Sequence, residues 1–149
     1  MRRSPKLTAL AKQGYRCAVI SGASSGIGLE IAKQLSEEGL SIIGISRSQP
    51  TSPPKNYTHI QADLLNPTEV AQALTQIEQA SPELWINNAG HGLLGGAWSP
   101  SQQEIDATFQ LMLHIPIRMT RSFAGQCQKK PRTPACLVQV SSLAVELPI

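Results

Sequence analysis

The stretch that decides the fold reads Val-Ile-Ser-Gly-Ala-Ser-Ser-Gly-Ile-Gly and spans residues 19–28. It overlaps an apolar run at residues 17–20 that is typical of a buried strand. It leads into a segment of helical periodicity that runs from Ile27 to about Glu38. Glycines let backbone N–H groups approach an anion, and the N-terminus of a helix favours negative charge. The stretch therefore predicts a phosphate-binding turn.

The glycine spacing is G-x-x-x-G-x-G, formed by Gly22, Gly26 and Gly28, whereas the common dinucleotide fingerprint is G-x-G-x-x-G. An ordinary tight turn is the alternative interpretation of any one glycine-rich turn. Three glycines between a strand and a helix favour nucleotide binding instead. Ser24 and Ser25 add hydroxyl donors within the turn.

Strand-like and helix-like segments alternate along the rest of the chain. We expect strands at residues 17–20, 40–46, 57–62, 84–87 and 136–140, helices at 27–38, 67–80 and 101–123, and a polar loop at 125–134. Asn66 followed by Pro67 is typical of a helix start, and Ser101 with Glu104 has the spacing of a capping box. The alternation predicts one α/β domain over residues 1–149, with a tail at 1–14 and a parallel sheet covered by helices on both faces.

The composition narrows the class of protein. Hydrophobic residues make up 41% of the 149 residues, enough for a core, and the net charge of +3 is too small to argue for nucleic acid. The three cysteines, Cys17, Cys127 and Cys136, lack the spacing of a metal site or a disulfide framework, which favours a reducing, cytoplasmic location. Neither a secretory signal nor an apolar run of transmembrane length occurs in the sequence, so we expect no membrane span.

A short polar motif follows each expected strand after the first. These motifs are Ser46-Arg47-Ser48, Asp63-Leu64, Asn87-Asn88-Ala89-Gly90 and Ser141-Ser142. The carboxyl ends of parallel strands meet at one edge of a sheet, and doubly wound sheets bind their ligands there. The motifs therefore predict one shared site together with the glycine turn.

In this order and at these separations, the motifs resemble those of the short-chain dehydrogenases/reductases. The resemblance covers most of the chain from about Arg16 onward. It implies a Rossmann-type doubly wound parallel sheet in three α/β/α layers, incomplete here at about five strands. It also implies an oxidoreductase that transfers a hydride between a nicotinamide cofactor and a carbonyl or alcohol substrate.

The resemblance assigns cofactor-binding roles to specific residues. The pyrophosphate would lie on the glycine turn, at Gly22, Ser24, Ser25, Gly26, Ile27 and Gly28. Asp63 would accept a hydrogen bond from the adenine amino group, with Leu64 beside the ring, and a simple turn residue is the alternative for Asp63. Asn87, Ala89 and Gly90 would line the adenosine ribose, with a structural turn as the alternative.

Arg47 decides the expected cofactor. NAD-binding relatives carry an acidic residue at the end of the second strand, whereas NADP-binding relatives offer a cation to the 2′-phosphate. Here Ser46 stands in the acidic position and Arg47 follows it. We expect NADP, with NAD less favoured, and a solvent-exposed loop arginine is the alternative interpretation. Ser25 stands where many NADP-binding members carry a second basic residue.

The catalytic residues of the family are only partly present. Ser142 matches the family serine by position, with a strand-terminating serine as the alternative, but the sequence to Ile149 contains no Tyr-x-x-x-Lys motif. Met112 stands where the family has an asparagine. Its alternative role is in an apolar helical stripe with Ile105, Phe109, Met119 and Phe123. His91 follows the Asn-Asn-Ala-Gly motif, where it would face either the cleft or solvent.

We therefore expect an NADP-dependent oxidoreductase, present as a truncated cofactor-binding part that is inactive alone. A non-catalytic dinucleotide-binding or interaction module is the alternative. A homo-oligomer formed through the helix at 101–123 is a further expectation from the resemblance. The last strand is expected to form a bare edge of the sheet, which favours association.

Overall fold

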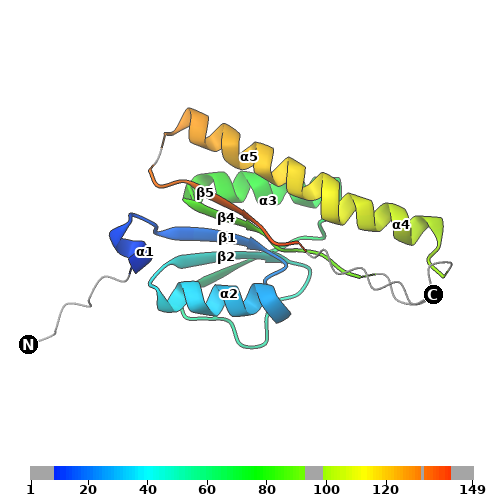
Figure 1. Cartoon of the computed structure of the whole chain (residues 1–149), viewed down its shortest axis with the longest axis horizontal. Coiled ribbons are helices and arrows are strands. Elements are labelled where there is room, and N and C mark those ends of the chain that lie inside the picture. Colours follow the sequence, from blue (N-terminus) through cyan, green and yellow to red (C-terminus); the bar gives the residue numbers. More distant parts are fainter. Residues whose placement is uncertain (1–8, 93–98, 132, 142–149) are drawn as a thin grey trace, which may run out of the picture.

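A computed structural model of the chain describes residues 9–92, 99–131 and 133–141. In these residues the structure is a sheet of five parallel strands in the order β3-β2-β1-β4-β5 (Figure 1). The strands are β1 (Cys17–Ser21), β2 (Ser41–Ser46), β3 (Tyr57–Gln61), β4 (Leu84–Asn87) and β5 (Cys136–Gln139). The expected doubly wound parallel sheet is confirmed.

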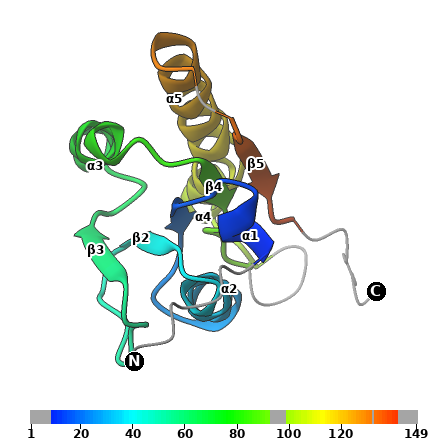
Figure 2. The ribbon, with the colours of Figure 1, turned by 90° about the vertical axis from the view of Figure 1, so that its left-hand side faces the viewer.

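Helices cover both faces of this sheet, which gives three layers (Figure 2). One face carries α1 (Ala9–Lys12) and α2 (Gly26–Glu37), and the other carries α3 (Pro67–Ala80), α4 (Gln102–Phe109), a π-helical turn η1 (Gln110–His114) and α5 (Ile115–Lys129). The chain runs outward from β1 to β3, and then returns to place β4 and β5 on the other side of β1. This change of direction opens a crevice at the carboxyl ends of β1 and β4.

Two apolar cores hold the layers together. On the α2 face, Ile20 and Ile42 pack with Ala32, and all three are fully buried. On the other face, Trp85 is fully buried and its ring centroid lies 5.6 Å from that of Phe123 on α5. Because the three central strands face helices on both sides, their residues are apolar almost without interruption, as in other buried parallel strands.

The long helix expected at residues 101–123 differs from the structure in two ways. It continues to Lys129, into the segment expected to be a loop, and it is interrupted by the turn η1, which ends two residues before Pro116. Proline lacks an N–H and its ring crowds the carbonyl of the preceding turn, so a wider π-helical turn relieves the conflict. The segment at 1–14, expected to be a tail, contains the short helix α1, whose Ala11 carbonyl accepts a hydrogen bond from the Arg16 guanidinium at 2.7 Å.

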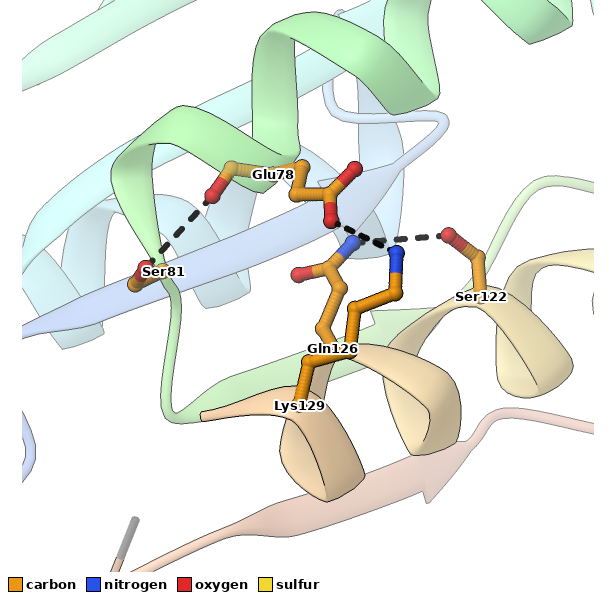
Figure 3. A network of polar contacts seen from close by, with 5 residues as sticks. All are labelled: Glu78, Ser81, Ser122, Gln126 and Lys129. Carbon is orange, nitrogen blue, oxygen red and sulfur yellow. Dashed lines mark hydrogen bonds and ion pairs between the residues drawn. The ribbon is translucent and has the colours of Figure 1, made fainter. Parts of the chain in front are cut away.

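An ion pair links α3 to α5, beside a hydrogen bond within α5 (Figure 3). The Lys129 ammonium lies 3.2 Å from a Glu78 carboxylate oxygen, and the amide nitrogen of Gln126 donates to Ser122 Oγ at 3.4 Å. The ion pair is exposed, and such pairs add little stability. The buried apolar residues of α5, Ile115, Met119 and Phe123, therefore carry most of the attachment.

Candidate functional site

A cleft of about 460 Å³ lies at the carboxyl ends of the strands. Its walls come from the glycine turn and from the segments after β2, β3 and β4, as the motifs in the sequence predicted. The lining residues are Gly22, Ser24, Ser25, Gly26, Ile27, Gly28, Ile45, Ser46, Arg47, Ser48, Ala62, Asp63, Leu64, Leu65, Asn88, Ala89, Gly90, His91 and Leu111. The structure thus brings together every residue that the sequence assigned to cofactor binding except Asn87.

The glycines give the turn after β1 a shape that other residues cannot take. Gly22 and Gly26 have positive φ angles of 70° and 54°, which side chains disfavour. At Gly28, a Cβ atom would overlap the carbonyl oxygen of Gly22 and lie 2.5 Å from the amide nitrogen of Asn88. The backbone of the turn is therefore packed directly against the start of α2, as a phosphate-binding turn requires.

Helix α2 presents an uncapped N-terminus to this cleft. Ser25 is the N-cap residue, but its side chain makes no capping hydrogen bond. The first backbone N–H groups of a helix have no partner within the helix, and they carry the positive end of its dipole. These donors, with the hydroxyls of Ser24 and Ser25, fit the pyrophosphate of a dinucleotide.

Ser21 and Asn88 brace the turn from below. The Ser21 hydroxyl oxygen accepts hydrogen bonds from the backbone N–H groups of Asn88 and Ala89, each at 3.0 Å. In return, the Asn88 side-chain amide donates to the carbonyl oxygens of Ser21 and Gly22 at 3.1 and 3.3 Å. The ends of β1 and β4 are thus cross-linked, and Asn88 is a cleft residue to which the sequence alone assigned no role.

Asn87 does not line the cleft. It is 2% exposed, and its amide nitrogen donates to the Pro116 carbonyl at 3.4 Å and to Thr120 Oγ1 at 3.2 Å. Its side-chain oxygen accepts a hydrogen bond from the Trp85 indole at 3.2 Å. Successive residues of a strand point to opposite faces, so Asn87 faces α5 while Asn88 faces the turn. Asn87 therefore lies where the alternative interpretation, a structural role, would place it.

Asp63 lines the cleft and also shapes the turn after β3. Its Oδ1 accepts a hydrogen bond from the Leu65 backbone N–H at 2.9 Å, while its own N–H donates to a Glu69 carboxylate oxygen at 2.7 Å. Leu64 is 5% exposed and contributes apolar surface to the cleft. The turn role and the cleft position therefore occur together, and an apolar wall beside a carboxylate suits an adenine ring.

At the end of β2, Ser46 is 7% exposed and Arg47 is exposed on the rim of the cleft. The Arg47 guanidinium makes no hydrogen bond or ion pair with the residues that the structure describes. The residue at the end of β2 is Ser46 and not an acid, so the position before Arg47 places no carboxylate beside the guanidinium.

The other end of the cleft contains His91, whose Nε2 lies 3.1 Å from Thr108 Oγ1. Met112, 46% exposed on η1, reaches toward Gly90, where a Cβ would lie 3.5 Å from the Met112 methyl carbon. A thioether donates no hydrogen bond, so Met112 does not supply the amide of the family asparagine. Ser142, the expected catalytic serine, lies outside the described residues.

The two tyrosines are poorly suited to acid–base chemistry. Partial burial raises the pKa of Tyr15, and the neighbouring Cys136 raises it further. Burial also raises the pKa of Tyr57, although a hydrogen bond with Ser46 opposes this. A tyrosine that passes a proton near neutral pH needs a lowered pKa, so neither side chain replaces the missing motif.

Metal clusters and membrane-spanning helices are both absent from the described part of the chain. No group of three or more His, Cys, Asp or Glu side chains there is arranged to hold a metal ion. No helix among these residues combines the length and apolar character that crossing a membrane requires.

Comparison with known proteins agrees with this geometry. A family model described as short chain dehydrogenase matches residues 16–149. The chain is 30% identical over 127 residues to a 3-ketodihydrosphingosine reductase of Bacteroides thetaiotaomicron, a match that covers 84% of this chain and 46% of that protein. The chain spans about half the length of the curated relatives it matches.

Solved structures of dehydrogenases and oxidoreductases are also similar to this chain. A 4-hydroxyisoleucine dehydrogenase complexed with NADH has a TM-score of 0.77 at 25% identity, over 86% of this chain and 56% of that one. A metagenomic short-chain oxidoreductase in complex with NADP has a TM-score of 0.74 at 26% identity, over 90% and 65% of the two chains.

Proposed function

The chain belongs to the short chain dehydrogenase family, and we propose that within this family it is an NADP-binding oxidoreductase segment. The cofactor would lie in the cleft, with its pyrophosphate on the glycine turn, its adenine amino group on Asp63 with Leu64 beside the ring, and its 2′-phosphate against Arg47. When bound, NADP carries a hydride to or from a carbonyl or alcohol carbon.

One observation carries the choice of NADP. A free, exposed Arg47 stands at the rim after β2, and the preceding position holds Ser46 instead of a carboxylate. A guanidinium matches the geometry and charge of a phosphate. The related structures contain NADH in one case and NADP in the other, so the fold accommodates either cofactor.

The chain as given is proposed to bind the cofactor without reducing a substrate. It contains no tyrosine followed four residues later by lysine, and the pKa values of Tyr15 and Tyr57 are raised, not lowered. A non-catalytic dinucleotide-binding module is the second candidate function. The free, partly buried thiols of Cys17, Cys127 and Cys136 support the cytoplasm as its location.

Titration of the protein with NADPH and with NADH tests the cofactor assignment. We expect tighter binding of NADPH, and Arg47→Ala should weaken NADPH binding about 10- to 100-fold, because a charge-assisted hydrogen bond to phosphate is lost. Binding of NADH should change little. Arg121→Ala removes an exposed arginine on α5, outside the cleft, and serves as the matched control. Tighter binding of NADH by the unaltered protein would contradict the proposal.

Turnover separates the two candidate functions. We expect no oxidation of NADPH with a broad panel of ketones above the level of a Ser142→Ala variant. Turnover that depends on Ser142 would show that the chain is catalytic without the tyrosine and lysine, and it would exclude the binding-module alternative.

A further inference from the structure

Behind the Arg47 corner lies a histidine to which the sequence alone assigned no role. His59 lies on β3, and its partner in the register with β2 is Gly44. Its Nε2 lies 3.1 Å from the carbonyl oxygen of Ser46 and 3.2 Å from the Ser46 hydroxyl oxygen. The Ser46 hydroxyl also lies 3.0 Å from the carbonyl oxygen of Ser48 and donates to it. His59 and Ser46 thus hold the backbone on both sides of Arg47.

Proton accounting fixes the roles in this cluster. The carbonyl oxygens of Ser46 and Ser48 only accept hydrogen bonds, and the Ser46 hydroxyl has one proton to give. The contact of His59 with the Ser46 carbonyl therefore requires a hydrogen on Nε2, whichever way the Ser46 hydroxyl points. The opposite tautomer would set the Nε2 lone pair against the Ser46 carbonyl. The neutral ring is therefore the Nε2–H tautomer.

The same face of β3 also approaches the glycine turn. Tyr57, two residues before His59, has its hydroxyl 3.5 Å from the carbonyl oxygen of Ala23. Strand β3 thus contacts both the glycine turn, at Ala23, and the end of β2, at Ser46. The contact of His59 is the closer of the two, and it acts at the corner that holds Arg47.

We propose that His59 is a positioning residue for cofactor choice: its Nε2–H holds the Ser46-Arg47-Ser48 turn so that Arg47 meets the 2′-phosphate of NADP. This inference rests on the proposed function. Because no described residue holds the Arg47 side chain, its direction depends on the backbone that carries it. Fixing that backbone before binding lowers the ordering cost of the phosphate contact. NADH lacks that phosphate, so its binding should not depend on His59.

Two substitutions at His59 test this role. His59→Phe keeps a ring of similar size and removes the donor, whereas His59→Gln places an amide N–H at the same number of bonds from the Cα atom. We expect His59→Phe to weaken NADPH binding about tenfold with less than a twofold change for NADH, and His59→Gln to restore most of the preference. His114→Phe, an exposed histidine on η1, is the matched control and should change neither affinity.

The outcomes separate the two proposals. Absence of binding of either cofactor by the unaltered protein contradicts the proposed function. An unaltered protein that prefers NADPH, with a His59→Phe variant that keeps the full preference or loses both cofactors equally, contradicts the inference alone. Where His59→Phe fails to fold, Ser46→Ala removes the hydroxyl that contacts His59 and donates to the Ser48 carbonyl, and it should reduce the preference in the same direction.

A readout without cofactor completes the test. Long-range ¹H–¹⁵N correlation spectra of the ligand-free protein at pH 8 distinguish the two tautomers of a neutral histidine. We expect the Nε2–H form for His59, and its retention in Ser46→Ala, because the backbone carbonyl of residue 46 still accepts from Nε2. A predominant Nδ1–H form would overturn the proposed hydrogen bond, whatever the cofactor affinities.

Discussion

Gly28 is the residue of the cleft at which space is most limited. A side chain there would overlap the backbone carbonyl of Gly22 and crowd the side chain of Asn88. The Gly22 carbonyl belongs to the backbone of the turn, so it cannot move aside as a flexible side chain could. Gly125 on α5 has the opposite surroundings, since a Cβ there meets nothing within 4 Å. The two glycines allow one substitution to be compared in two contexts.

Gly28→Ala should destabilise the protein by about 1–3 kcal/mol, as for other overpacked sites, and should abolish NADPH binding. Gly125→Ala should raise stability by about 0.5–1 kcal/mol, because alanine is the better helix former in an open helical position. Thermal unfolding of both variants, with cofactor titration, measures the contrast. An equally stable Gly28→Ala that still binds NADPH would refute the packing argument.

At the scale of single residues, the sequence alone was sufficient to predict which residues line the cleft where their position depends on local geometry. The glycines of the turn, Asp63 and Arg47 all line the cleft as expected. Asn87 and Asn88 could not be distinguished, because their directions depend on which residue of β4 is the last to face α5. His59 gave no signal, since its contact with Ser46 depends on the pairing of two strands.

At the scale of elements, α4 depends on its first turn. Ser101 Oγ accepts a hydrogen bond from the Glu104 N–H at 3.3 Å, and Glu104 accepts from the Ser101 N–H at 2.7 Å, as the capping box in the sequence predicted. Backbone and side-chain hydrogen bonds from Ser101 hold the pKa of Glu104 below its usual value. The cap therefore favours the charged carboxylate.

Ser101→Ala should cost about 1 kcal/mol of stability at pH 7, the typical value of an N-cap. Because the pKa of Glu104 is lower in the folded state than in the unfolded state, the stabilisation contributed by the charged Glu104 carboxylate is full above its unfolded pKa. It is lost as the pH falls through the folded value. Denaturant unfolding of Ser101→Ala and of the control Gln103→Ala at pH 7 and pH 3 measures this. The cost should be smaller at pH 3, where the hydrogen bond from Ser101 Oγ to the charged Glu104 is lost but the bond from the Glu104 N–H to Ser101 Oγ remains. An equal cost at both pH values would contradict the proposed role of the charge.

The helical stripe expected from the sequence was wrong in its first half. Met119 and Phe123 are buried, but Phe109 and Met112 are 58% and 46% exposed. A π-helical turn inserts an extra residue, which rotates the helix before the turn relative to the helix after it. Periodicity assumes 3.6 residues per turn throughout, so it assigns both halves to one face. Pro116 was the visible signal for the interruption.

At the scale of the whole molecule, that rotation leaves apolar side chains on the outer face of α4, η1 and α5. Phe109, Met112, Leu113 and Ile117 are 58%, 46%, 48% and 59% exposed. Strand β5 adds Leu137 and Val138, exposed on opposite faces of the sheet, and among the described residues it pairs only with β4. Exposed apolar surface and an open strand edge both favour association.

We therefore expect the protein to self-associate through this outer face of α4, η1 and α5. The double variant Phe109→Glu/Ile117→Lys should weaken association at least about tenfold, because it removes two apolar side chains from the contact. Gln128→Lys adds charge elsewhere on α5 as the control. Sedimentation velocity over a concentration series measures the effect. Unchanged sedimentation of the double variant would point instead to the edge of β5.

The hydrogen bonds of Ser21 and Asn88 bear on how fast a ligand binds to the glycine turn. These hydrogen bonds are internal to the protein, so the glycine turn proposed to bind phosphate is in place before any ligand arrives. Capture then requires diffusion and orientation but no slow rearrangement at that end of the cleft. Differences in affinity among ligands that share the pyrophosphate would then arise in how long each one stays.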